Sequence, residues 1–410
     1  MLTSIATVLA LTGLSMMGPT ASVGTQPAGQ SDDGPRLVVI SDTEIIADGI
    51  TYDSWEAVGE SGFYQFQENR CKTISFDFEG NGQIERGGPG DCSFARTRIE
   101  AQYDPSVQKY RIPVVVHILE RNNGTGGMPD SRVTSQIEIL NEDFLAISGT
   151  NGGPGTDIQI EFYLATEDPS GNPTTGITRS VNDTWYNDGG AYYNSLAWDT
   201  NRYLNIYTNN GGGALGYVPN LPQGGIAGLN SDRVVILHST FGRNAPFNPY
   251  NLGRTVTHEV GHYLGLEHTF AGGCSGTSYT NGDWIVDTNP ESSPTGGCPN
   301  SRTSCGQPAP IHNYMDYSYD ICMNQFTPEQ ANRMRCSLIH YRPNLYTVAG
   351  PTGCNDADLA EPLGQLNFFD VSAFLTAFST QDSIADFDGN GSYDFFDISL
   401  FLGTYNIGCP

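Results

Sequence analysis

The segment His258–His268, with the sequence HEVGHYLGLEH, restricts this chain more than any other feature. On a helix, His258 and His262 are four residues apart and project from the same face, so both imidazoles can bind one metal ion. Gly265 tolerates left-handed backbone angles, which lets the chain leave the helix sharply and bring back His268 as a third ligand. Three imidazoles leave a fourth coordination position open for water, an arrangement typical of catalytic rather than structural zinc.

Glu259 is the candidate general base of this site. It follows His258 directly and lies on the metal side of the expected helix. Its carboxylate can therefore accept a proton from the water and pass it to a leaving amine. The alternative is a helix of core and surface histidines without a metal. That alternative is disfavoured, because three spaced histidines and a carboxylate have no packing purpose.

The chain on both sides of this segment alternates buried strands with a few helices, a pattern that predicts an α/β sheet domain. We expect strands at Ile112–Leu119, Ile158–Ala165, Tyr203–Tyr207 and Arg233–His238. We expect helices at Ser131–Phe144, Arg254–Leu266 and Thr327–His340.

The extended histidine segment is the metzincin motif, and the chain resembles the pappalysin family of metzincins, with its bacterial ulilysin-like members, over about residues 105–345. The segments that carry the resemblance are Ile112–Leu119, His258–Phe270, Gly282–Thr288, Asn313–Tyr317, Cys322–Met323 and Phe326–Gln330. The resemblance implies an α/β (α+β) metzincin fold, with a twisted mixed sheet, an active-site helix and a loop-rich lower subdomain stapled by disulfides. It also implies a zinc-dependent endopeptidase, in which a zinc-activated water hydrolyses peptide bonds.

The same resemblance implies roles for three further residues. Met315 would be the Met-turn residue, whose side chain forms an apolar floor beneath the zinc; the alternative is an ordinary core methionine. Tyr317 would hydrogen-bond the tetrahedral intermediate, with core packing as the alternative. Asp320 would favour basic residues beside the scissile bond, as in some relatives.

A short loop after the histidines is a candidate calcium site. Asp283, Asp287 and Thr288 bring carboxylate and hydroxyl oxygens together, and calcium prefers such hard oxygen ligands. Members of the family bind calcium near this loop, so the resemblance implies a structural calcium ion here. The alternative is a capped surface turn.

Residues 354–410 form a separate tail with an internal repeat, since Asn367–Leu375 recurs as Asp394–Leu402. The second loop fits an EF-hand calcium site, with Gly391 at the sharp sixth position, whereas the first loop is degenerate. The expected ligands in the second loop are Asp386, Asp388, Asn390, Asp394 and Asp397. Aspartate rather than glutamate at the twelfth position resembles dockerin modules. This resemblance implies a small helical tail that docks to a cohesin-like partner or to the cell surface.

Nine cysteines agree with an oxidising compartment, and their odd number leaves at least one unpaired within the chain. Cys354 and Cys409 lie at the two ends of the tail, and a bond between them would close it. Four cysteines of the loop-rich part allow three pairings, of which the family resemblance implies Cys274–Cys305 and Cys298–Cys322.

Cys71, Cys92 and Cys336 remain. Asn69–Lys72 loosely resembles the cysteine switch of metzincin propeptides, in which a thiolate occupies the open zinc position where water must sit. A bond between Cys92 and Cys336 would leave Cys71 free for this role. The alternative is a bond between Cys71 and Cys92, with Cys336 buried and free.

Changes in amino-acid composition along the chain predict four parts. An apolar run near the N-terminus, followed by small residues, indicates a signal peptide over 1–24; the alternative is a buried or membrane-spanning helix, but the run is too short to span a bilayer. Residues 25–100, with few periodic segments, would be the propeptide of a zymogen, 101–346 the catalytic domain and 354–410 the tail. We therefore expect a secreted protein, extracellular or associated with the cell surface.

The net charge of −26 disfavours binding to nucleic acid or to an anionic membrane surface. We expect protein or peptide substrates, no nucleic-acid partner and no transmembrane segment. A calcium-dependent adhesion protein is the chief alternative function, but an inactive copy would be expected to have lost a catalytic residue, and all are present. A metallohydrolase acting on other substrates is the second alternative.

Overall fold

The computed structural model of the chain describes residues 37–65, 70–73, 108–275, 282–349, 354–360, 364–388 and 390–409. The expected signal peptide over 1–24 and Cys92 lie outside these residues. No helix in the described ranges is long and apolar enough to cross a membrane.

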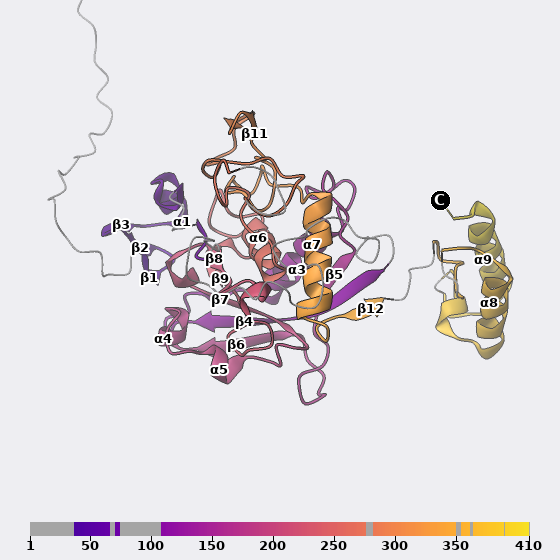
Figure 1. Cartoon of the computed structure of the whole chain (residues 1–410). Helices are drawn as coiled ribbons and strands as arrows, with labels where there is room; N and C mark the ends of the chain where they lie inside the picture. Colours follow the sequence, from indigo (N-terminus) through magenta and orange to yellow (C-terminus); the bar gives the residue numbers. More distant parts are fainter. Residues whose placement is uncertain are drawn as a thin grey trace, which may run out of the picture. The chain divides into compact units, whose positions relative to one another are not determined.

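A seven-stranded, mostly parallel sheet forms the centre of residues 108–349, the part in which the sequence predicts the catalytic domain and which is called the catalytic region below (Figure 1). Its longest strand, β4 (Lys109–Glu120), pairs in parallel with β5 (Ile160–Leu164), β6 (Ile177–Val181) and β7 (Leu204–Asn209). The sheet continues from β7 through β9 (Val234–Leu237) to β8 (Gly216–Tyr217), which is antiparallel to β9. The antiparallel strand β12 (Thr347–Ala349) joins β4 on the other side.

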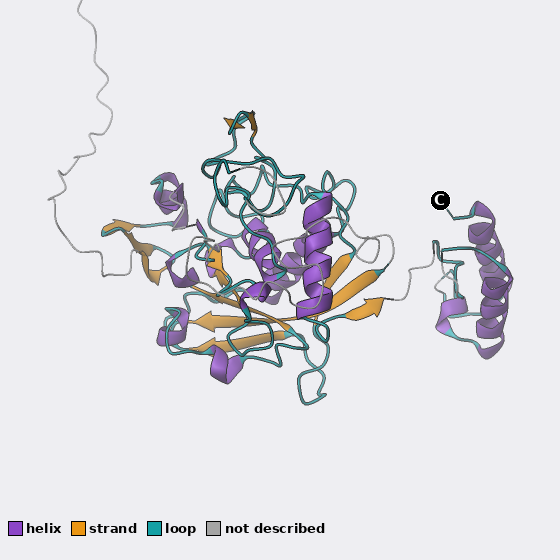
Figure 2. Cartoon of the chain, in the orientation of Figure 1, coloured by secondary structure: helices purple, strands orange, loops and turns teal. Residues whose placement is uncertain are grey.

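Three helices cover one face of the sheet, and two short helices lie on the other (Figure 2). The covering helices are α3 (Asp130–Phe144), α6 (Arg254–Tyr263) and α7 (Pro328–Tyr341). The short helices are α4 (Asp183–Tyr186) and α5 (Tyr193–Leu196). Single 3-10 turns lie at Phe63–Gln65, Gly211–Gly213, Pro222–Gly224, His238–Thr240 and Ser383–Ala385.

The main core forms between the sheet and α3, α6 and α7. Successive side chains of a strand point to opposite faces, so Val114 and Val116 of β4 enter this core while Val115, between them, packs on the other face. Apolar residues at helical spacing in α3, such as Val133, Ile137 and Leu140, complete the contact. The sheet thus fixes α6, which carries the first two histidines, on its buried face.

The segment that precedes β4 differs from the expectation of little regular structure over 25–100. Strands β1 (Leu37–Ser41), β2 (Glu44–Ala47) and β3 (Ile50–Tyr52) form an antiparallel sheet, and helix α1 (Trp55–Glu60) follows. These elements are short, and their apolar residues pack with Phe247 and Tyr250 of the catalytic region. Tertiary contacts rather than local periodicity therefore stabilise them.

Residues 266–326 form the loop-rich part of the catalytic region, with one short hairpin, β10 (Thr303–Ser304) and β11 (Gln307–Pro308), among its described residues. The bonds Cys274–Cys305 and Cys298–Cys322 are both present and close loops in this part. Cys336 is also disulfide-bonded, and Cys71 is the one free cysteine in the described part of the chain. The alternative bond between Cys71 and Cys92, with Cys336 free, is therefore wrong.

The tail consists of α8 (Phe368–Thr380) and α9 (Phe395–Ile407), closed by the bond Cys354–Cys409. Its small core centres on Phe374 and Phe401, whose rings stack at 4.0 Å. The repeat seen in the sequence has a structural counterpart: Asn367 and Asp394 begin their helices with the same capping box.

Candidate active site

Glycines with positive φ lie on both sides of helix α6. Gly253 precedes it at φ +77°, and the carboxylate Oδ2 of Asp320 accepts hydrogen bonds from the backbone N–H groups of Leu252 (2.9 Å) and Arg254 (3.2 Å). Gly265 follows it at φ +96°, where an added Cβ would lie 2.5 Å from Ser337 Oγ. The chain therefore leaves the helix at the glycine that the sequence indicated, which turns His268 back toward α6.

The three histidines present their Nε2 atoms to one another. His262 Nε2 lies 3.2 Å from His258 Nε2 and 3.0 Å from His268 Nε2. Two backbone carbonyls fix the rings, since His258 Nδ1 donates to Tyr314 O (2.6 Å) and His262 Nδ1 donates to Leu266 O (2.7 Å). Their Nε2 lone pairs therefore face inward, where a cation is the fitting partner.

Burial keeps these imidazoles neutral, as metal ligands must be. It lowers the pKa of His262 to about 4 and the pKa values of His258 and His268 well below the usual range. The donor set of three neutral imidazoles fits zinc.

Glu259 is buried beside this centre. Its Oε2 accepts hydrogen bonds from Thr73 Oγ1 (3.2 Å) and from Cys71 Sγ (3.5 Å), while Oε1 has no hydrogen-bond partner among the described residues. Burial raises the pKa of Glu259 to about 8. A carboxylate with one oxygen free and a high proton affinity is suited to accept a proton.

Cys71 joins the histidines. One ligand atom from each of Cys71, His258, His262 and His268 lies within 4.8 Å of the others. Backbone contacts hold the segment 70–73 beside β8, where Lys72 N donates to Gly216 O at 3.3 Å. The thiol therefore lies where a fourth ligand would be.

Met315 and Tyr317 both contact the histidine centre or its helix. Met315 is fully buried. Its Sδ lies so close to Gly261, in the middle of α6, that a Cβ added to this glycine would be only 2.5 Å from the sulfur. The Tyr317 hydroxyl lies 3.2 Å from His268 Nε2. Met315 thus packs directly against the turn of α6 that carries the first two histidines.

Gly261→Ala should destabilise the protein, because the new methyl group would overlap Met315 Sδ. Overpacking of this kind costs about 1–3 kcal/mol, more than the roughly 1 kcal/mol that alanine gains over glycine in a helix. Urea unfolding measures the difference. The matched control is Gly403→Ala in α9, where no atom lies within 4 Å of the new Cβ. An unchanged unfolding free energy for Gly261→Ala would contradict this packing.

Arg70 is a residue of this site that the sequence analysis did not assign. Its guanidinium lies 4.2 Å from the ring centre of Tyr250 and 5.3 Å from that of Tyr317, and Nη2 donates to Ser318 O at 3.1 Å. Asp320 lines the same pocket. The position directly before Cys71 was the one signal in the sequence that could have identified it.

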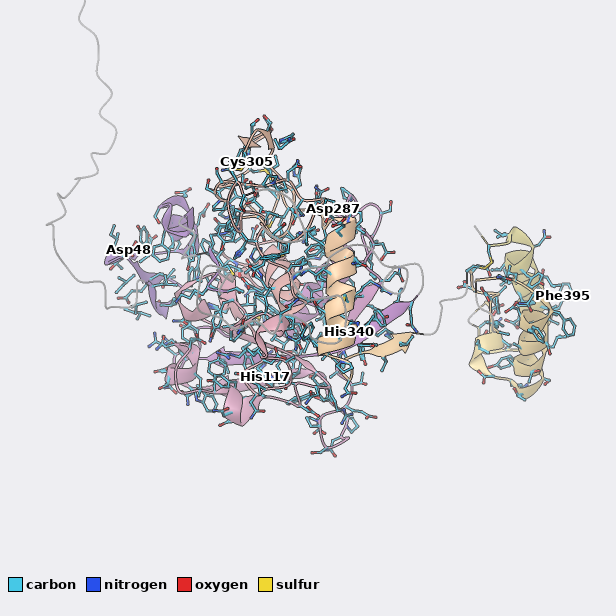
Figure 3. The ribbon with its side chains drawn as sticks, viewed as in Figure 1. Asp48, His117, Asp287, Cys305, His340 and Phe395 are labelled. Carbon is cyan, nitrogen blue, oxygen red and sulfur yellow. A yellow bond between two sulfur atoms is a disulfide. The ribbon has the colours of Figure 1, made fainter. Side chains whose placement is uncertain are left out.

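The three candidate calcium ligands do not all bond to one another. Thr288 Oγ1 donates to Asp283 Oδ2 at 2.6 Å, so these two residues lie together. Asp287 instead lies at the N-terminal end of α7, where it accepts hydrogen bonds from Thr327 Oγ1 (2.6 Å) and Glu329 N (3.0 Å) (Figure 3). The loop therefore has a structural role at the start of α7.

In the tail, Asp386, Asp388 and Asp397 each bring a carboxylate oxygen within 4.8 Å of the others. Asn390 Nδ2 contacts Asp388 Oδ2 at 2.7 Å, and the backbone N–H of Asp394 donates to Asp397 Oδ2 at 2.9 Å. All five candidate ligands thus lie in one small loop.

Residues 191–339 match the peptidase M43 family, described as pregnancy-associated plasma protein-A. The chain is 40% identical over 241 residues to an extracellular metalloprotease of Colletotrichum graminicola, covering 56% of this chain and 77% of that protein. It is 40% identical over 230 residues to extracellular metalloprotease 1 of Coccidioides posadasii, covering 54% of this chain and 74% of that protein.

Solved structures of mirolysin are also similar to this chain. Mirolysin in complex with compound 9 has a TM-score of 0.52 and 38% identity, covering 58% of this chain and 96% of that chain. A promirolysin variant from Tannerella forsythia has a TM-score of 0.52 and 36% identity, covering 60% of this chain and 87% of that chain.

Proposed function

The chain belongs to the peptidase M43 family and is a metalloendopeptidase, and on this premise we propose that it is a secreted zinc endopeptidase made as a latent proenzyme. The observation that carries the proposal is the convergence of three neutral imidazoles on one point beside the free oxygen of Glu259. Secretion is supported by the relatives, which are named extracellular metalloproteases.

His258, His262 and His268 would hold the zinc. When bound, zinc supplies Lewis acidity for the scissile carbonyl and for the attacking water. Glu259 accepts the proton of that water at its free oxygen and delivers it to the leaving amine. The Tyr317 hydroxyl, 3.2 Å from His268 Nε2, is close enough to the centre to donate to the developing oxyanion.

Cys71 would hold the proenzyme latent. Its thiol lies among the histidines and against Glu259, so it occupies the space in which water and the scissile carbonyl must bind. Residues 70–73 also lie along β8 and cover the edge that an extended substrate would use. Latency therefore rests on one metal-binding atom and on a covered strand edge.

Removal of zinc should lower hydrolysis of casein by at least about a hundredfold, and added zinc should restore it. The physical reason is that the three histidines supply the whole protein ligand set, and Glu259 alone cannot polarise the carbonyl. A chelator titration of the matured enzyme, with calcium held in excess, measures the effect. Full activity in metal-free protein would contradict the proposal.

We also propose that calcium binds in the tail loop with Asp386, Asp388, Asn390, Asp394 and Asp397. A second calcium ion at Asp283, Asp287 and Thr288 is supported only by the family resemblance, since Asp287 is engaged at the start of α7. The tail would dock the enzyme to a cohesin-like partner or to the cell surface. Its exposed aromatic side chains support docking, because Phe368 and Phe395 are 76% and 74% exposed, and Phe395 lies on the surface of the tail in Figure 3.

Deletion of residues 354–410 should leave peptide hydrolysis within about twofold of the full chain while abolishing attachment to cells, because no described residue of the tail belongs to the histidine centre. Activity in the supernatant and in the cell fraction measures both outcomes. Replacing the exposed Phe368, Phe369, Phe395 and Phe396 by serine in the full chain should likewise abolish attachment and leave hydrolysis unchanged. A folded but inactive truncated protein would contradict the proposed division.

A further inference from the structure

A loop of three glycines beside β8 receives the side chain of Lys72. Cys71 and Thr73 both reach Glu259, one from each side of Lys72 in the sequence. Because successive side chains of extended backbone point to opposite sides, Lys72 points away from Glu259. Its Nζ donates a hydrogen bond to the carbonyl oxygen of Gly212.

The glycines leave room for this ammonium group. Gly212 and Gly213 have φ values of +60° and +89°, a region that favours glycine. A Cβ on Gly213 would lie 3.4 Å from Lys72 Nζ, and a Cβ on Gly212 would lie 2.7 Å from Asp188 Oδ2. Side chains at these two positions would therefore separate a cation from Asp188.

Asp188 provides the negative charge behind the loop. Its Oδ1 accepts hydrogen bonds from Tyr192 OH (2.7 Å) and Asn209 Nδ2 (3.0 Å), and its Oδ2 accepts one from Tyr217 OH (2.7 Å). These donors are neutral and fix the carboxylate. Arg233 reaches the same Tyr217 hydroxyl at 3.0 Å, with that hydroxyl between it and Asp188. Arg233 also donates to the Tyr192 hydroxyl at 3.4 Å, so it lies behind both tyrosines. The carboxylate is thus fixed by neutral donors, with its Oδ2 next to Gly212 of the glycine loop.

We propose that the Gly211–Gly213 loop and Asp188 form a cation-binding subsite for a lysine or arginine of the substrate. This subsite is distinct from the pocket that Arg70 shares with Asp320, because Lys72, Asp188 and the glycine loop are not among the residues that line that pocket. The segment 70–73 lies along β8 (Gly216–Tyr217), and an extended peptide that replaces it would present its own side chains to both places. The preferred substrates are then peptides with basic residues on both sides of the scissile bond. This inference rests on the proposed endopeptidase function.

A series of peptides tests the inference. Each peptide has the same cleavage site and a single lysine, which stands at a different position around that site in each member of the series. Each is matched by a peptide with glutamine at that position, and the enzyme matured from the full chain is assayed. We expect two positions, on opposite sides of the scissile bond, at which lysine raises kcat/KM over glutamine by about threefold to tenfold. Asp188→Asn should abolish one preference and Asp320→Asn the other. Asp183→Asn, an exposed carboxylate on α4, is the matched control and should retain both.

Two further measurements keep the inference testable if Asp188→Asn fails to fold. In the wild-type enzyme, the lysine preference that belongs to the glycine loop should weaken as ionic strength rises. In the full chain before processing, Lys72→Gln should raise peptide hydrolysis by about threefold, while Lys72→Arg should not, because only the arginine keeps the charge. A single basic preference that Asp188→Asn leaves unchanged would overturn the inference, as would equal latency of the two Lys72 variants. If no peptide is cleaved by any zinc-replete variant, the endopeptidase function itself fails.

Discussion

Glu259→Gln should lower kcat by at least about a hundredfold while the protein keeps its zinc, because the amide cannot accept the proton of the attacking water. Glu259 is not one of the three imidazole ligands, and its Oε1 is free of hydrogen bonds among the described residues. The glutamine preserves the size of the side chain in a fully buried position. Peptide hydrolysis is measured together with the zinc content of the purified protein.

The matched control is Glu161→Gln on β5, whose carboxylate pairs with Arg111 at 3.0 Å, outside the histidine centre. This variant should retain normal turnover and zinc. Near-normal turnover of a zinc-replete Glu259→Gln enzyme would remove Glu259 from the mechanism. Loss of zinc together with activity would instead show that Glu259 stabilises the metal site.

Cys71→Ala should make the unprocessed chain hydrolyse peptides about tenfold or more faster than the unprocessed parent, because the ligand that competes with water is gone. The thiol is the part of the segment that lies with the three imidazoles, whereas the Thr73 hydroxyl bonds Glu259 and the backbone N–H of Val218, just after β8. Initial rates must be measured before any processed chain appears on a gel. Thr51→Ala on β3, in the same preceding segment, is the matched control.

A Cys71→Ala chain as latent as its parent would exclude the switch. Latency would then rest on the covering of β8 by residues 70–73 alone. The variants Lys72→Gln and Cys71→Ala separate these two contributions, because the first weakens the side-chain contact at the glycine loop and the second removes the metal-binding atom.

The histidine centre could be predicted from the sequence because its geometry is local. His258 and His262 share one helical face at a spacing of four residues, and Gly265 requires a backbone angle that few other residues adopt. The disulfides of the loop-rich part were a different case. Spacing allowed three pairings, and only the family resemblance selected the two that are present.

Arg70, Asp188 and the strands β1–β3 could not be predicted in this way. Arg70 and Asp188 are more than a hundred residues apart. Arg70 reaches the histidine pocket and Asp188 reaches Tyr217 of β8 because the fold places β8 beside residues 70–73. Strand β8 has two residues and contains a glycine, so it carries no period-two pattern. The strands β1–β3 are stable because of contacts with residues about two hundred positions away, which no local propensity records.

If the chain is the proposed latent proenzyme, the apolar contact between residues 37–65 and the catalytic region would delay the appearance of activity after the chain is cleaved. Trp55 and Tyr64 pack on Phe247, with ring centres 5.4 and 5.1 Å apart, and Arg121 donates to the backbone of β1. A cut between residues 73 and 108 breaks none of these contacts. The severed segment would remain as a bound inhibitor, so active enzyme would accumulate with a lag set by its dissociation rate. Dilution or digestion of the released piece would make activation irreversible, whereas a concentrated solution would favour rebinding.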